Sequence, residues 1–110
     1  MERALSRYED RFETRVFTLA ERTDCRARGQ PAKHFAVRFA AKEALLKVLG
    51  VPPGLNWHEI EVLPTESGAP QLILSGAAAE VAQQLGITRL HVSLTHSADM
   101  AAAVVIGESI

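Results

Sequence analysis

Phe35 to Gly50 reads FAVRFAAKEALLKVLG, and this segment is the most informative part of the sequence. At about 100° of rotation per residue, its apolar side chains fill two broad arcs that together cover most of a helix circumference. We predict a helix from about Ala32 to Leu49, with Gly50 as the residue that caps its C-terminus. A helix that is apolar on nearly every side lies deep in a fold or against a neighbouring subunit.

Four ionisable side chains interrupt the apolar surface of this helix. Glu43 and Lys47 are one turn apart and lie between the two apolar arcs, while Arg38 and Lys42 lie in the other gap. Burying four such groups is unfavourable unless something pairs them. One interpretation is an ordinary i,i+4 pair that stabilises the helix. The other is a phosphate site, in which Glu43 holds Mg²⁺ and the cations neutralise phosphate oxygens.

The segment before this helix is predicted to form two shorter helices. The first covers Met1 to about Arg15, and its outer side carries a cationic row formed by Arg3, Arg7, Arg11 and Arg15. Acidic neighbours partly neutralise this row, so a solvated face is an equally good interpretation. Thr18 and Glu21 form a capping-box pattern, which predicts a second helix that begins near Leu19. Gly29-Gln30-Pro31 ends it.

The second half of the chain changes to a period of two. A strand through Ile60 and Val62 is followed by a turn and a return strand, and an alanine-rich helix separates this hairpin from a second one. The remaining predicted elements are the return strand Gln71–Ser75, the helix Gly76–Leu85, a strand from Leu90 to Thr95 and a last strand from Ala101 to Ile106. The expected fold is α+β, an antiparallel sheet packed with helices, in one domain that covers residues 1–110.

The composition excludes several classes of protein. The chain has 110 residues and a single cysteine, so an internal disulfide and a cysteine-rich zinc site are both excluded. Its apolar runs are far shorter than the roughly 20 residues of a membrane-spanning helix, and Met1 to Arg7 has no pattern of a secretory signal. We therefore expect a cytoplasmic protein with neither a membrane nor a nucleic acid as partner.

The charges are distributed unevenly along the chain. Residues 1–50 hold eleven of the twelve lysines and arginines and seven acids, whereas residues 51–110 hold one arginine and six acids. This asymmetry suggests an anionic ligand or partner that docks on the first half. In the second half, His96 follows a strand that ends in hydroxyl residues, which is a good place for a ligand contact, although a hydrogen-bonded turn histidine is the commoner reason for a single histidine there.

Arg38 to Gly50 strongly resembles the second signature of the 4′-phosphopantetheinyl transferases, R-F-A-A-K-E-A-x-x-K-x-L/F-G, in the form found in the small holo-(acyl carrier protein) synthases. Arg11 to Glu21 is similar to the earlier family stretch R-F-x-x-R-[VI]-[FL]-T-x-x-E. Three later family landmarks have counterparts in the correct order, at Trp57–Val62, Gly68–Pro70 and His91–His96.

The resemblance implies a Mg²⁺-dependent transfer of 4′-phosphopantetheine from coenzyme A to a serine of an apo acyl carrier protein, with release of adenosine 3′,5′-bisphosphate. By position, Glu43 would be the metal ligand and, with Lys47 beside the pyrophosphate, would form the catalytic pair. The coenzyme A contacts would be Arg38, Lys42, Lys47 and His96. Arg11 and Arg15 would contact the acidic carrier protein. The family's small members are trimers with active sites between subunits, so we also expect a homotrimer.

One part of the family pattern has no counterpart in this chain. The family opens with a strand of the form G-[IV]-G-x-D, whose aspartate is a further metal ligand, whereas this sequence starts where the family is already in its first helix. A misassigned start, a truncation and a degenerate member are three alternatives. The expected activity therefore has a competitor, a non-catalytic module that binds coenzyme A or a carrier protein. The resemblance also leaves open whether that carrier serves fatty acid synthesis or polyketide and peptide synthesis.

Overall fold

The helix predicted around Phe35 is α3, which runs from Pro31 to Val48 in the computed structural model; the structure describes residues 10–97 and 99–109. Gly50 follows the helix with φ of 80°, a conformation that glycine adopts without strain. The N–H groups of Gly50 and Val51 donate to Lys47 O and Leu46 O at 3.1 and 2.8 Å, which is a Schellman motif and confirms the predicted cap. None of the described helices combines the length and hydropathy needed to cross a membrane.

The capping box before α3 is also confirmed. α2 runs from Leu19 to Arg26, and the Glu21 N–H donates to the Thr18 hydroxyl at 3.2 Å while the Glu21 carboxylate accepts from the Thr18 N–H at 2.9 Å. Residues 10–16 are helical, in agreement with the end of the predicted first helix. The rest of that prediction, together with Arg3 and Arg7, lies outside the described residues.

The described strands form two separate antiparallel hairpins rather than one sheet. β1 (Ile60–Pro64) follows the short 3₁₀ helix η1 (Trp57–Glu59) and pairs with β2 (Pro70–Leu74). After α4 (Gly76–Gln84), β3 (Arg89–His96) pairs with β4 (Ala101–Glu108). The predicted α+β class is confirmed.

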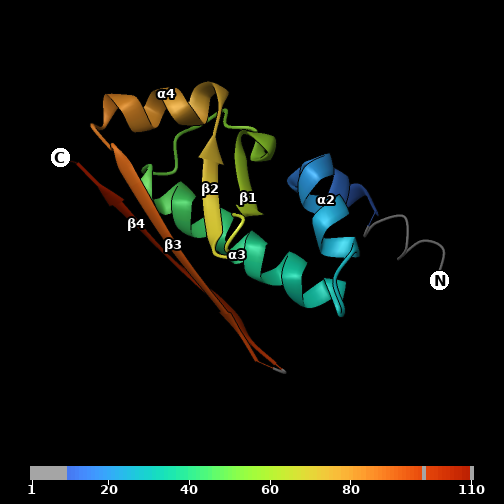
Figure 1. Cartoon of the computed structure of the whole chain (residues 1–110). Coiled ribbons are helices and arrows are strands. Elements are labelled where there is room, and N and C mark those ends of the chain that lie inside the picture. The colour runs from blue at the N-terminus through green and yellow to red at the C-terminus, as the bar shows by residue number, and fades with distance from the viewer. Residues whose placement is uncertain (1–9, 98, 110) are drawn as a thin grey trace.

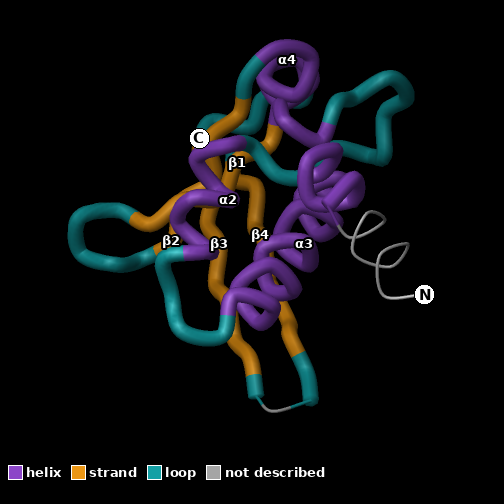
Figure 2. Tube along the Cα trace, turned by 90° about the vertical axis from the view of Figure 1, so that its right-hand side faces the viewer, coloured by secondary structure: helices purple, strands orange, loops and turns teal. Residues whose placement is uncertain are grey.

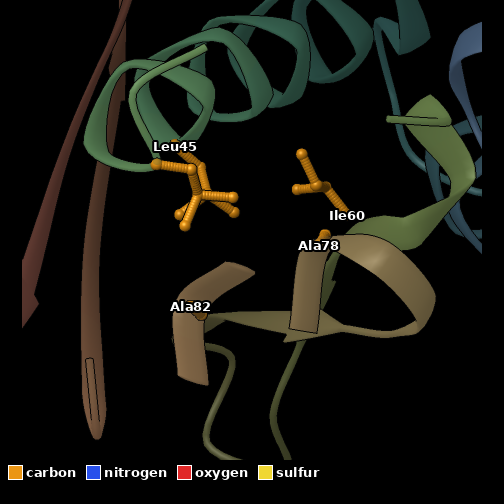
Figure 3. Packing of buried hydrophobic residues seen from close by; sticks show 5 residues of the cluster. Leu45, Ile60, Ala78 and Ala82 are labelled. Carbon is orange, nitrogen blue, oxygen red and sulfur yellow. The ribbon is translucent and has the colours of Figure 1, made fainter. Parts of the chain in front are cut away.

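The two hairpins pack around α3. Figures 1 and 2 show the long β3–β4 hairpin crossing α3, with α4 near one end of that hairpin. α3 packs against β4 and β3, and also against α2 and β1. The main core lies where α3, α4 and β1 meet, and Figure 3 shows Leu45 of α3 facing the small side chains of α4; its buried members are Leu45, Leu49, Ile60, Ala78 and Ala82. The alanines of α4 contribute small buried side chains to this core.

Candidate functional site

A buried ion pair joins α2 to α3. Lys42 is fully buried, and its ammonium donates to Glu21 Oε1 and Val16 O at 2.6 Å each and to Trp57 O at 3.3 Å. Burial lowers the pKa of Lys42, and the hydrogen bond from the ammonium to Glu21 offsets part of that shift. With all three ammonium protons engaged inside the protein, Lys42 has no donor left for a ligand. We therefore replace the predicted coenzyme A contact of Lys42 with a structural role. Lys42 and Glu21 form an internal framework that joins α2 to α3.

The carboxylate of Glu21 also connects this framework to β1. Glu21 Oε2 accepts a hydrogen bond from the Val62 N–H at 2.9 Å, so the outer edge of β1 is covered by a side chain of α2. Cys25 is buried on the same helix, and burial raises the pKa of its thiol to about 11. The thiol is therefore protonated at neutral pH and is not a nucleophile.

A second ion-pair group lies at the surface end of this framework. The Arg38 side chain is 6% exposed, and its guanidinium donates to Asp24 and, at 3.4 Å, to Glu21 O. Arg28 Nε donates to the same oxygen of Asp24 at 2.9 Å. Partial burial acts to raise the pKa of Asp24, but the hydrogen bonds and charges of Arg28 and Arg38 outweigh it and hold that pKa below its usual value. A guanidinium has five N–H donors, so both arginines keep donors beyond those that Asp24 uses.

These arginines form one wall of a cleft of about 200 Å³. Its nitrogen-bearing side chains come from three elements: Arg28 from the turn after α2, His34 and Arg38 from α3, and His96 from the end of β3. The His34 and His96 rings are edge-to-face with centroids 5.7 Å apart. The remaining walls are apolar or backbone, and include Val37, Val62, Leu94, Gly68 and Pro70. Two fixed cations and two imidazoles around an apolar floor suit a phosphorylated ligand with an aromatic or apolar part.

Sequence analysis found two of these four residues and missed the other two. Arg38 and His96 were predicted, and the structure brings them to one cleft. Arg28 and His34 were missed, although each carried a local signal. His34 is one helical turn before Arg38 and therefore lies on the same face of α3, and Arg28 is four residues after Asp24.

Glu43 and Lys47 lie on another face of α3. Both are exposed, and neither lines the cleft. Glu43 is five positions after Arg38, which places their directions about 140° apart around the helix axis. One copy of the chain therefore does not bring Glu43 and Arg38 to the same face. Within the described residues, no three metal-ligating side chains of histidine, cysteine, aspartate or glutamate gather at one point.

The described end of the cationic row is open to solvent. Arg11 and Arg15 are exposed on the helical segment 10–16, one turn apart. Phe12 of the same segment meets Phe39 of α3 edge-on, with ring centroids 5.4 Å apart, while Phe12 stays 39% exposed. The two arginines thus form an outward-facing cationic surface attached directly to α3.

A larger groove of about 670 Å³ lies between β2, α4 and β3. It contains none of the catalytic, metal, coenzyme A or carrier-protein contact residues predicted from the sequence, and the only cationic or titratable side chains in its lining are Arg89 and His91. The smaller cleft concentrates charge and holds two predicted residues, so we take the smaller cleft as the candidate site.

Comparisons with known proteins agree along nearly the whole chain. A family model described as the 4′-phosphopantetheinyl transferase superfamily matches residues 1–105. A holo-[acyl-carrier-protein] synthase from Anaeromyxobacter sp. (strain K) is 50% identical over 99 residues, which are 90% of this chain and 77% of the relative.

Two solved structures have the same fold. The holo-[acyl-carrier-protein] synthase of Neisseria meningitidis has a TM-score of 0.84 and 27% identity, with 97% of this chain and 87% of that chain covered. A complex of the Chronobacterium ammoniagenes enzyme with coenzyme A has a TM-score of 0.79 and 34% identity, with 90% and 81% covered. These two similarities confirm the fold class predicted from the sequence.

Proposed function

The chain belongs to the 4′-phosphopantetheinyl transferase superfamily and is therefore an enzyme, and we propose that it transfers 4′-phosphopantetheine from coenzyme A to a serine of an apo acyl carrier protein. The curated relative from Anaeromyxobacter bears the name of this activity, and a structural relative is a complex with coenzyme A. The other product of the proposed reaction is adenosine 3′,5′-bisphosphate.

The observation that carries the proposal is the cleft in which Arg38 and His96 converge with Arg28 and His34. Coenzyme A carries a 3′-phosphate, a pyrophosphate and an aromatic base, and this cleft offers cations beside an apolar wall on which an aromatic ring can pack. Asp24 holds Arg28 and Arg38 in place before a ligand arrives. Such preorganisation reduces the entropy lost on binding.

Glu43 and Lys47 fit a site for Mg²⁺ rather than for a metal that needs several protein ligands. Mg²⁺ is usually held by one or two carboxylates together with substrate phosphates and water, and Glu43 is an exposed carboxylate with Lys47 one turn away. Glu43 would hold Mg²⁺ and Lys47 would lie beside the pyrophosphate. The ion would supply positive charge that offsets the charge of the pyrophosphate.

The separation of the two groups of residues supports an active site between subunits. Arg38 and Glu43 face different directions on α3, so a ligand that contacts both would take them from two copies of the chain. The outer face of β4 offers a surface for such contact, because Val104 and Ile106 are 59% and 56% exposed. Clustered exposed apolar side chains of this kind mark association surfaces. We propose a homotrimer with composite sites.

Arg11 and Arg15 fit the other substrate. Acyl carrier proteins of the family are acidic and helical, and two exposed arginines one turn apart present a matching charge. Complementary charge of this type raises the encounter rate and the selectivity more than the affinity. We therefore assign Arg11 and Arg15 to carrier-protein contact.

The proposed chemistry requires positioning and charge balance. The serine hydroxyl loses its proton as its oxygen forms a bond to the phosphorus that bears pantetheine, and the bond from that phosphorus to the bridging oxygen breaks. Adenosine 3′,5′-bisphosphate leaves with the electron pair. Arg28, Arg38 and His96 would hold the departing nucleotide, and Lys47 would balance charge at the pyrophosphate.

The first test is a mass measurement on the carrier. The full chain is incubated with coenzyme A, Mg²⁺ and an apo acyl carrier protein, and we expect the carrier to gain the mass of one phosphopantetheine arm. Glu43→Gln should lower the transfer rate by about a hundredfold or more, because loss of a metal-ligating carboxylate weakens transition-state charge stabilisation. Glu80→Gln, the same change on exposed α4, should have little effect.

The mass measurement also tests the alternative that the chain is a non-catalytic module that binds coenzyme A or a carrier protein. Unchanged carrier mass at high enzyme concentration, together with coenzyme A binding by calorimetry that does not depend on Mg²⁺, would favour a non-catalytic binding module. Equal rates in the Glu43→Gln and Glu80→Gln variants would remove Glu43 from the active site.

A further inference from the structure

His34 lies in the wall of the candidate cleft, together with Arg28, Arg38 and His96. It is half-buried on α3, and its ring meets the His96 ring edge-to-face at 5.7 Å. Arg38 lies one helical turn further along the same face. The ring is thus a part of the cleft wall rather than a solvated surface side chain.

The charged groups around His34 come from three directions. Arg28 and Asp24 approach from α2 and the turn after it, Arg38 from α3 and His96 from β3. The walls of the cleft formed by β1, β2 and the turn between them contribute no ionisable side chain. Desolvation lowers the pKa of His34, and the charges of Arg28, Arg38 and His96 lower it further, while Asp24 opposes them. Because this lowers the pKa below the usual value for histidine, the neutral ring is the main form at pH 7.

We propose that His34 is a further ligand-binding residue of this cleft and takes up a proton from solvent when a phosphate dianion binds there. The inference rests on the proposed function, since coenzyme A supplies the phosphate. A dianion placed between Arg28, Arg38 and His96 reverses the sign of the field at the His34 ring. An imidazolium can then donate to a phosphate oxygen, which a neutral ring can do with one nitrogen only.

The sign of the pH effect follows from linkage. A group whose pKa is raised by the ligand strengthens binding fully below its pKa in the free protein, and that contribution is lost as the pH rises through its pKa in the complex. Binding of a nucleotide phosphate should therefore tighten on acidification from pH 8 to pH 6.

The test is calorimetry with adenosine 3′,5′-bisphosphate, in EDTA and without carrier protein. Titrations in two phosphate-free buffers with very different ionisation enthalpies give the number of protons taken up per ligand. The phosphates of the probe have a second pKa near 6 and change protonation themselves, so the quantity of interest is the difference between wild type and His34→Gln. We expect wild type to take up between about 0.3 and 1 proton more than the variant at pH 7.

The affinity gives a second readout. His34→Gln should weaken binding about three- to tenfold at pH 6 and change it little at pH 8, because the imidazolium forms only at the lower pH. His91→Gln, which alters an exposed histidine outside the cleft, should match wild type in both proton uptake and affinity.

Two results overturn the proposal in distinguishable ways. Binding by wild type with the same proton uptake as His34→Gln removes the role of His34 and leaves the proposed function intact. If wild type does not bind the nucleotide at either pH, the role of His34 and the proposed function are both refuted. If the variant fails to fold, the pKa of His34 in wild type, followed by its ring resonances in NMR, decides the matter: it should rise on addition of the nucleotide, and a constant or lower value would refute the inference.

Discussion

At the scale of single residues, the same kind of charged side chain has two different roles on α3. Lys42 and Arg38 are both buried, but Lys42 ends inside the protein on Glu21, whereas Arg38 ends at the wall of a cleft. A buried ion pair contributes little net stability when both partners are present, yet removing one partner leaves a costly unpaired charge. Glu21 and Lys42 therefore hold α2, α3 and β1 in the arrangement that places Arg38.

Glu21→Gln should destabilise the fold by about 3 kcal/mol, because the Lys42 ammonium would remain buried without its counter-charge. Urea denaturation measures this change. The double variant Glu21→Gln with Lys42→Met should recover part of the loss, since it removes the orphaned charge. Glu13→Gln, which breaks the solvent-screened pair with Arg26, should lose about 1 kcal/mol or less. Equal losses at positions 13 and 21 would contradict this account.

At the scale of elements, α3 presents two groups of proposed site residues in different directions. His34 and Arg38 face the cleft, while Glu43 and Lys47 face outward, because the residue spacing between the groups turns them around the axis. The Schellman motif at Gly50 stops the helix and turns the chain toward Trp57, whose carbonyl accepts from Lys42. The end of this helix therefore affects the framework of the site.

Gly50→Ala should destabilise the protein by about 1 kcal/mol, because alanine is strained at φ of 80°. Gly29→Ala is a matched control, since an added Cβ at either position meets nothing within 4 Å and Gly29 does not have a left-handed φ. Thermal melts of both variants measure the difference. A Gly29→Ala variant that loses as much stability as Gly50→Ala would show that the backbone conformation is not the cause.

At the scale of the whole molecule, the outer face of the β3–β4 hairpin is unusual. Val104 and Ile106 of β4 point outward, opposite Ser93 and His91 of β3 in the pairing register. The inner face of the same hairpin packs on α3. A sheet with apolar side chains on both faces of one strand is typical of a strand that is covered on both sides.

Ile106→Glu should convert the proposed trimer into monomers, because it places a charge in the apolar contact. Light scattering after size exclusion should give about three times 12.0 kDa for wild type and a single chain mass for the variant. Transfer activity should fall with the trimer. Leu19→Glu changes a residue that is 69% exposed on α2 and should leave the mass unchanged. A monomeric wild type with full activity would rule out composite sites.

The helices and strands of this protein are predictable from its sequence, because their signals are local. The helical period through Phe35 to Gly50, the pair Thr18 and Glu21 and the alternation in β3 each depend on neighbours a few residues away. The sequence also indicated Arg38 and His96, through the match of their surroundings to a family motif. The sequence did not distinguish the structural role of Lys42 from the cleft-lining position of Arg38, since both lie in the same gap between the apolar arcs of the helix.

The partner of each buried charge, in contrast, depends on contacts between segments that are distant in the sequence. Glu21 and Lys42 are 21 residues apart, and no periodicity predicts their contact. His34 joined the site because β3 brings His96 against α3 from far along the chain. Local patterns fix which faces of a helix are apolar, but the partner of a buried or half-buried charge depends on how distant segments pack, and that packing decides whether the charge supports the fold or faces a ligand.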